Sequence, residues 1–197
     1  MEKKLTVADM LKEGVGIGMK NMVPILVNAL LWILTIWIPY LNIGTTIGMM
    51  IGIVSKASKG EAISMTEIFN PQYRKYMGEF FLTYGLVMMG VSAGMIFFII
   101  PGLVIAMAWS LALLLAVDKG INPVEAISKS NNATYGYKST MFLAQFVLGA
   151  VVMILGAIFS RIPGIGPLLV LALMVCAIFV GIGMQAYVYK ALASDIK

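Results

Sequence analysis

The sequence has no histidine, a single cysteine and few charged residues. The lack of histidine removes the side chain most often used as a general base or a metal ligand near neutral pH. Cys176 alone excludes an intramolecular disulfide and any cysteine cluster for zinc or an iron–sulfur centre. Charged residues form 12% of the chain, against about 25% in average soluble proteins, which excludes a disordered chain and a nucleic-acid-binding module.

Apolar residues are abundant instead, at 60% of the 197 positions, against about 45–50% in average soluble proteins. We therefore predict an all-α, polytopic membrane protein in which residues 1–197 form a single integral membrane domain. Three long apolar blocks, 21–55, 80–117 and 139–189, alternate with four charged blocks. Arg161 is the one charged residue within the three apolar blocks. Because one crossing needs about 20 apolar residues, each block is long enough for two.

Each block contains a proline near its middle, in an Ile-Pro pair, and these residues are Pro39, Pro101 and Pro163. Proline interrupts helical hydrogen bonding, so each block is predicted to be a helical hairpin that bends at its proline. The six predicted transmembrane helices are 22–38, 41–57, 80–99, 102–118, 140–160 and 165–188. The first hairpin is short for two crossings, so a re-entrant hairpin is the alternative for it.

In this arrangement every charged residue except Arg161 lies on one side of the membrane. The positive-inside bias assigns that side to the cytoplasm, so both termini are predicted to be cytoplasmic in a multi-pass protein of the cytoplasmic (inner) membrane. Arg161 is expected at the outer interface, because at the membrane centre it would cost about 2.5–3.5 kcal/mol. Amphipathic segments with lysine and arginine are expected to lie on the anionic cytoplasmic leaflet of the lipid bilayer.

Two sequence markers recur at a near-constant spacing, which predicts a threefold internal repeat. The three prolines of the Ile-Pro pairs are 62 residues apart. Capping-box patterns, each with an acid three residues after the capping side chain, begin at Thr6, Ser64 and Asn122, 58 residues apart. The predicted repeats cover about 6–58, 64–118 and 122–190, each with a cytoplasmic amphipathic helix before its hairpin.

Small residues within the predicted spans indicate close helix packing, within the chain or in a homo-oligomer. The candidate packing residues are Gly44, Gly48, Gly52, Gly90 and Gly94. The polar residues Asn28 and Gln145, with Arg161, either line a polar path or form hydrogen bonds between helices.

The predicted spans hold no acid or histidine that could serve a catalytic or metal centre. We therefore predict no enzyme activity, no cofactor and no metal site. The favoured function is a non-enzymatic integral membrane protein that organises the membrane or assists a membrane-protein partner. The alternative is a channel or transporter for a small solute, since internal repeats are common in transporters.

One stretch carries a resemblance to a known family: Ile100-Pro101-Gly102, then Val117-Asp118-Lys119-Gly120, then Glu125-Ala126-Ile127 with Ser130 and Gly136. It resembles the multi-span membrane domain found with some glycerophosphodiester phosphodiesterases, and related stand-alone six-helix prokaryotic membrane proteins. The resemblance implies a multi-span α-helical domain. It implies no phosphodiesterase activity, because the catalytic barrel with its acidic metal ligands has no counterpart in this sequence.

Overall fold

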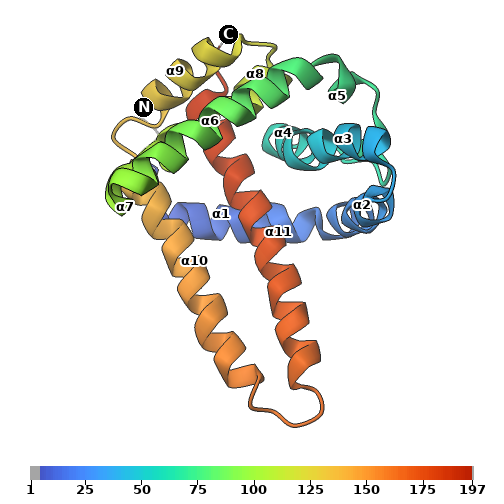
Figure 1. Cartoon of the computed structure of the whole chain (residues 1–197). Helices are drawn as coiled ribbons and strands as arrows, with labels where there is room; N and C mark the ends of the chain where they lie inside the picture. The colour runs from blue at the N-terminus through green and yellow to red at the C-terminus, as the bar shows by residue number, and fades with distance from the viewer. Residues whose placement is uncertain (1–4, 197) are drawn as a thin grey trace.

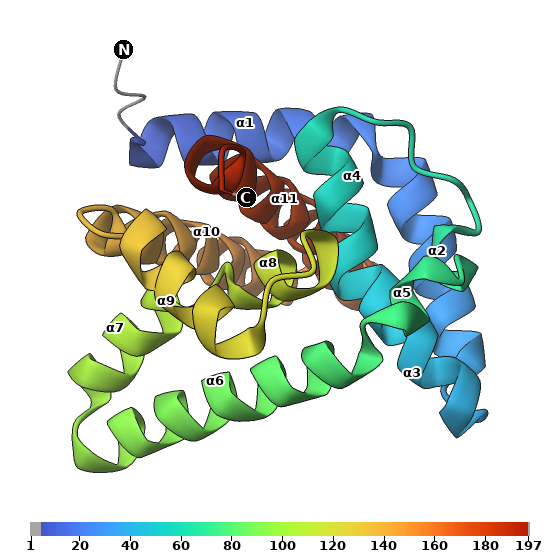
Figure 2. The same cartoon turned by 90° about the horizontal axis from the view of Figure 1, so that it is seen from above.

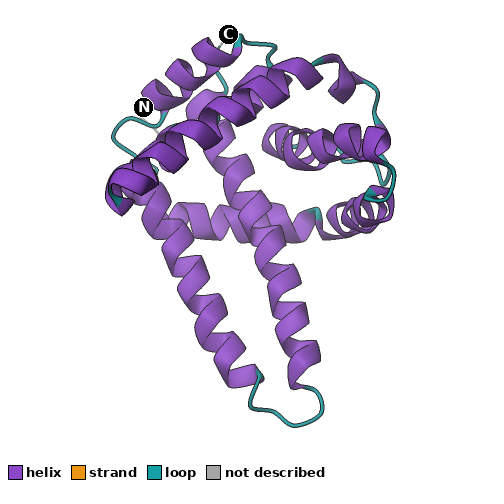
Figure 3. Ribbon diagram, in the orientation of Figure 1, coloured by secondary structure: helices purple, strands orange, loops and turns teal. Residues whose placement is uncertain are grey.

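The computed structural model describes residues 5–196, and every regular element within them is a helix (Figures 1 and 3). The elements are α1 (Val7–Lys20), α2 (Met22–Thr35), α3 (Pro39–Ile47), the π-helix η1 (Gly48–Gly52), α4 (Ile53–Lys59), the 3-10 turn η2 (Glu67–Phe69), α5 (Gln72–Lys75), α6 (Met77–Phe97), α7 (Ile99–Ala108), α8 (Ala112–Asp118), α9 (Pro123–Ala133), α10 (Lys138–Phe159) and α11 (Gly166–Ala193). The predicted all-α class is confirmed.

Three hairpins extend from one central region, which contains α4, α8 and the C-terminal part of α11 (Figures 1 and 2). The first hairpin is α2 with α3, the second is α6 with α7, and the third is α10 with α11. In Figure 1, α10 and α11 descend together below the body, whereas Figure 2 shows the other two hairpins pointing in different directions. The first two tips carry exposed apolar side chains, with Trp37 87% and Ile96 82% exposed.

Four helical segments of the described chain are long and apolar enough to cross a membrane, in keeping with a membrane protein. They are α6, the stretch Ile99–Asp118 in which a short break separates α7 from α8, α10 and α11. They correspond to predicted spans 80–99, 102–118, 140–160 and 165–188, with ends shifted by a few residues. The pair α1 and α2, bent by 72° at Asn21, is a fifth candidate if it forms one broken span.

The first predicted hairpin accounts for the difference between this result and the six predicted spans. α2 has 14 residues, which is fewer than the roughly 17 needed for a crossing. The predicted span 41–57 is divided by the π-helix η1, and the helix after it ends in the charged stretch that contains Lys56 and Lys59. Four or five spans are therefore supported by helix length and composition, and the six-span arrangement and threefold repeat are not.

The three prolines lie close to the three chain reversals, in different local roles. Pro39 is the first residue of α3, and Pro163 lies in the turn between α10 and α11. In the second hairpin the reversal is instead at Phe98, whose backbone is extended (φ −159°, ψ 138°), three residues before Pro101. Pro101 is tolerated in the first turn of α7 because an N–H there has no partner within the helix.

Two of the three predicted capping motifs start helices of the expected kind. The Thr6 hydroxyl accepts the backbone N–H of Asp9 at the start of α1 (3.1 Å), and the Asn122 side chain accepts the N–H of Val124 at the start of α9 (3.1 Å). Ser64 differs, because only the short 3-10 turn η2 follows it. The amphipathic helix predicted there does not form. Pro71 interrupts the segment, and residues 64–75 pack tightly against α3 and η1 instead.

The closest helix crossing joins α1 to α11 through glycines. Gly183 of α11 lies so close to Gly14 and Gly18 of α1 that a Cβ on it would overlap the backbone of both residues. A Cβ on Gly18 would likewise lie 2.7 Å from the carbonyl carbon of Phe179. A Gly-x-x-x-Gly pattern allows such backbone approach in membranes, where helices gain no hydrophobic drive from packing together. This packing role of Gly14 and Gly18 was missed in the sequence.

The predicted packing glycines are also covered, but mainly by short segments rather than by long helices. A Cβ on Gly48 would lie 2.7 Å from the Cα of Ile68, and Gly52 lies under the ring of Tyr73. Gly44 lies beneath the side chain of Arg74, and Gly90 lies beneath the ring of Trp109. Gly94 alone faces another helix backbone, with 2.8 Å between its Cβ position and the Cα of Gly102.

We predict that Gly18→Ala destabilises the folded protein by about 1–3 kcal/mol, because the added methyl group forces α1 away from α11. Gly16→Ala is the matched control, since nothing lies within 4 Å of its Cβ position. It should stabilise α1 by up to about 1 kcal/mol through helix propensity. Thermal unfolding of both variants in the same detergent measures the difference. Equal melting temperatures for the two variants would contradict the close α1–α11 crossing.

Candidate functional site

Asp118, the last residue of α8, joins segments that belong to all three hairpins. One carboxylate oxygen accepts hydrogen bonds from the Ser55 hydroxyl (2.5 Å) and the Lys59 ammonium (2.7 Å), both on α4, which continues the first hairpin. The other accepts the Tyr189 hydroxyl of α11, at 2.8 Å. The Asp118 side chain is only 13% exposed, so its charge depends on these three donors. We call this cluster of Ser55, Lys59, Asp118 and Tyr189 the polar base.

The next residue, Lys119, binds the C-terminal end of α11. Its ammonium donates to the carbonyl oxygens of Ala193 (2.6 Å), Ser194 (3.0 Å) and Ile196. The last carbonyls of a helix have no partner within the helix and carry partial negative charge, so a cation there is favourable. Gly120 follows with φ +65°, a conformation that suits glycine and turns the chain toward α9.

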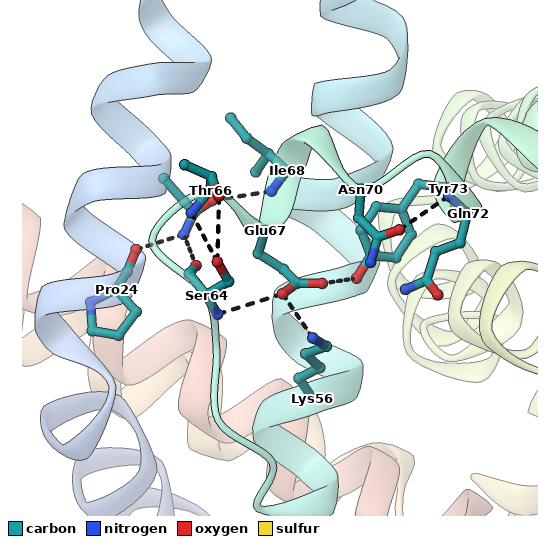
Figure 4. Close-up of polar contacts among 10 residues, drawn as sticks. Pro24, Lys56, Ser64, Thr66, Glu67, Ile68, Asn70, Gln72 and Tyr73 are labelled. Carbon is teal, nitrogen blue, oxygen red and sulfur yellow. Dashed lines mark hydrogen bonds and ion pairs between the residues drawn. The ribbon is translucent and has the colours of Figure 1, made fainter.

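A second buried carboxylate, Glu67, lies on the short segment that covers α3 and η1 (Figure 4). It accepts hydrogen bonds from the Lys56 ammonium (2.7 Å) and the Tyr73 hydroxyl (2.7 Å). The backbone N–H of Ser64 adds a longer bond of 3.4 Å to the same carboxylate. Glu67 is 2% exposed, so this side chain fixes the 64–75 segment against the helix that carries Lys56.

The donors around Glu67 decide its protonation state. Burial alone would raise the pKa of the Glu67 carboxyl. The hydrogen bonds from Lys56 and Tyr73, together with the positive charge of Lys56, outweigh burial and hold that pKa below its ordinary value of 4.5. The pKa of the Tyr73 hydroxyl is raised by its burial and by the hydrogen bond to Glu67. The pair therefore stays as carboxylate and neutral phenol at neutral pH.

A cavity of about 350 Å³ borders Asp118, and polar side chains from three segments and from Glu61 line it. Lys56 and Lys59 come from α4, Asp118 from α8, and Asn70, Gln72 and Tyr73 from the covering segment. Asp118 already accepts hydrogen bonds from one lysine and two hydroxyl groups, so its lone pairs are largely used by the protein. Among residues 5–196 no three His, Cys, Asp or Glu side chains gather where they could hold a metal ion.

Side chains of α9 and α11 form hydrogen bonds with backbone groups at the break between α7 and α8. The Ser130 hydroxyl donates to the carbonyl of Ala108 (2.7 Å) and accepts the backbone N–H of Leu111 (3.1 Å). Gln185 donates to the carbonyl of Ser110 at 3.0 Å. An unpaired backbone group costs several kcal/mol in an apolar environment, so these bonds permit the interruption of this span. The sequence alone did not indicate this role for Ser130 or Gln185.

Asn28 and the other residues of the predicted polar path occupy very different surroundings. Asn28 is completely buried; its amide nitrogen donates to the carbonyls of Pro24 (2.9 Å) and Ser64 (2.8 Å). Its side-chain oxygen accepts the backbone N–H of Ile68 at 3.1 Å. Asn28 therefore bonds α2 to the covering segment, which is the second role that the sequence analysis left open for it.

Gln145 and Arg161 make no hydrogen bond with Asn28 in the described part of the chain, and both are exposed. Arg161 lies in the turn between α10 and α11, whereas Gln145 is in the second turn of α10, about 20 Å away along the helix. Gln145 instead borders a small cavity of about 100 Å³ together with Gln185 of α11.

No family model, curated protein or solved structure matches this chain. The function of the polar base therefore has to be argued from its own geometry.

We predict that Asp118→Asn lowers the free energy of unfolding by about 2–4 kcal/mol, because the amide cannot accept three strong bonds and leaves Lys59 without its counter-ion. Glu125→Gln is the matched control. It removes an exposed ion pair with Lys129, four residues along one helix, and should cost less than about 0.5 kcal/mol. Chemical denaturation in detergent compares the two variants, and similar losses would remove the special role given to Asp118.

A pH dependence follows from Glu67. Because its pKa is lower in the folded chain than the ordinary 4.5, the unfolded chain takes up the proton first as the pH falls. Stability contributed by Glu67 is present above pH 4.5 and is lost as the pH drops below it. We expect the melting temperature to fall less steeply over this range in Glu67→Gln than in the parent, with Tyr73→Phe intermediate. Parallel curves for all three proteins would refute this assignment.

Proposed function

We propose that the chain is a non-enzymatic integral protein of the cytoplasmic membrane that organises the bilayer or assists a membrane-protein partner. The observation that carries this proposal is the contrast between the polar base and the hairpins that extend from it. The polar base uses its carboxylate in an ion pair between segments, whereas α6 and α10 are largely uncovered, with 11% and 6% of their most apolar stretches buried. Such helices need lipid or another membrane protein to cover them.

In the proposed arrangement the three hairpins, which point in different directions in the structure, turn to enter the membrane from the cytoplasmic side as three related repeats, and both termini stay in the cytoplasm. The location of the charges supports this orientation. Lysines at the base, such as Lys56, Lys59 and Lys119, surround the ends of the helices, whereas the hairpin tips carry Arg161 as their one charge in the described chain. The proposal includes kinship with six-helix membrane domains of the kind that the Asp118-Lys119-Gly120 stretch resembles.

Cysteine accessibility in proteoliposomes tests the topology, with Cys176→Ala as the background. Single cysteines at Tyr40, Phe98 and Ser160 report the three tips, and cysteines at Lys12 and Lys75 report the charged side of the membrane, where the polar base is proposed to lie. We expect an impermeant maleimide to label the tips from one side only and the base from the other. Labelling of a tip from the same side as Lys12 would show that its hairpin does not cross, which is the re-entrant alternative for the first hairpin.

A channel or transporter for a small solute is the second candidate, and one observation favours it. The cavity of about 100 Å³ between α1, α10 and α11 is bordered by the amides of Gln145 and Gln185, in otherwise apolar surroundings. Two amides could replace part of the hydration shell of a small neutral solute. The Gln185 amide nitrogen already donates to Ser110, which leaves less of the site free for a solute.

Flux measurements separate the two candidates. Purified protein in liposomes is tested with a panel of ions and small neutral solutes, beside empty liposomes. Under the first proposal, we expect permeation equal to that of empty liposomes. Solute flux that falls in Gln145→Leu but is unchanged in Met153→Leu, a change at an exposed residue of the same helix, would favour the transporter instead.

A further inference from the structure

A long apolar groove lies between α7 and the beginning of α10. One face of α7 supplies Ile100, Leu103, Val104 and Met107, at the spacing of successive helix turns, and Phe142 of α10 forms the facing wall. The groove encloses about 580 Å³. Ile100 (74% exposed) lies at its tip end, so the groove is continuous with the exposed apolar surface of the second hairpin.

The opposite end of the groove is positively charged. Lys138 and Ser139 line it there, beside Gly136. The Lys138 ammonium donates to the side-chain oxygen of Asn131 at 2.8 Å, a neutral partner, and within residues 5–196 no carboxylate pairs with it. Lys138 is also the first residue of α10, whose N-terminus has no side-chain cap and no acid in its first turn. The partial positive charge of that helix end adds to the charge of Lys138.

We infer that this groove binds one anionic phospholipid, with an acyl chain along α7 and the phosphate at Lys138. The inference rests on the proposed insertion of the protein into a membrane. An anionic phospholipid matches both parts of the groove: its acyl chain is apolar like the α7 wall, and its negative headgroup is complementary to Lys138. In the proposed orientation Lys138 lies at the cytoplasmic surface and Ile100 deeper in the bilayer. The bound lipid therefore keeps the orientation of a bilayer lipid, with its headgroup at the surface and its acyl chain in the interior.

The charge at one end distinguishes this occupant from a second copy of the chain. An apolar helix from another copy would fill the groove but would leave Lys138 without a negative partner. The phosphate of an anionic lipid supplies that charge, and a cation near an anionic headgroup contributes about 1 kcal/mol, which corresponds to about a fivefold preference.

Native mass spectrometry of the purified full-length protein in detergent tests the inference. The protein is equilibrated with equal amounts of phosphatidylglycerol and phosphatidylcholine that carry identical acyl chains. We expect about fivefold more phosphatidylglycerol than phosphatidylcholine to remain bound. In Lys138→Gln the ratio should fall to about one while both lipids still bind, because the amide keeps a donor for Asn131 and the groove is unchanged.

Two further variants separate the groove from general effects. Val104→Trp fills the groove and should reduce the retention of both lipids, and its melting temperature verifies that it folds. Lys75→Gln removes an exposed lysine outside the groove and should leave the ratio at its parental value.

The inference is overturned by equal retention of both lipids in the parent protein, or by an equal fall of the ratio in Lys75→Gln and Lys138→Gln. A dimer that is lost in Val104→Trp, without any lipid adduct, would identify a second copy as the occupant. The topology measurement reports membrane insertion independently. An inserted protein with no lipid preference would thus refute this inference alone, whereas labelling of every tip from the base side would refute the proposed function.

Discussion

The ion-paired carboxylate of Asp118 is the interaction on which the arrangement of the hairpins depends. Its two oxygens accept donors from α4 and α11 while the residue itself ends α8, so one side chain fixes three segments that are far apart in the sequence. Removing such a charge from water is costly unless every partner is present. The base is therefore an all-or-none contact, because each donor is needed to offset the buried charge.

Composition, charge blocks and the Ile-Pro pairs were sufficient to predict the helical class, four helical segments long and apolar enough to cross a membrane, and the approximate positions of the chain reversals. These features follow from local rules, because a crossing needs a fixed number of apolar residues and a helix cannot continue through certain backbone positions. The first hairpin was harder to predict. The apolar run 21–55 has the right length, but a 72° bend at Asn21 and the π-helix at Gly48–Gly52 depend on what packs against them.

The polar base could not be predicted from spacing, because Ser55 and Tyr189 lie at distant positions in the sequence, 63 residues before and 71 residues after Asp118, and none of its members is unusual by itself. Asp118 and Lys119 drew attention only through a resemblance, and their contacts with α4 and α11 need the folded chain. The partners of the packing glycines were equally difficult to predict from the sequence. Gly44, Gly48 and Gly52 were recognised as a packing face, yet the partner is a short segment with Ile68 and Tyr73 rather than a long helix. A small-residue pattern indicates close approach without identifying what approaches.

The sequence order of the polar base has a consequence for biosynthesis. Ser55 and Lys59 leave the ribosome before Asp118, so the carboxylate can find these partners as soon as the second hairpin is made. Tyr189 follows 71 residues after Asp118, when most of α11 has been synthesised. Until then one carboxylate oxygen lacks its donor and Lys119 lacks the carbonyls at the end of α11. The nascent protein therefore passes through a stage in which Asp118 and Lys119 lack part of their hydrogen-bond partners. Synthesis of the third hairpin supplies these partners.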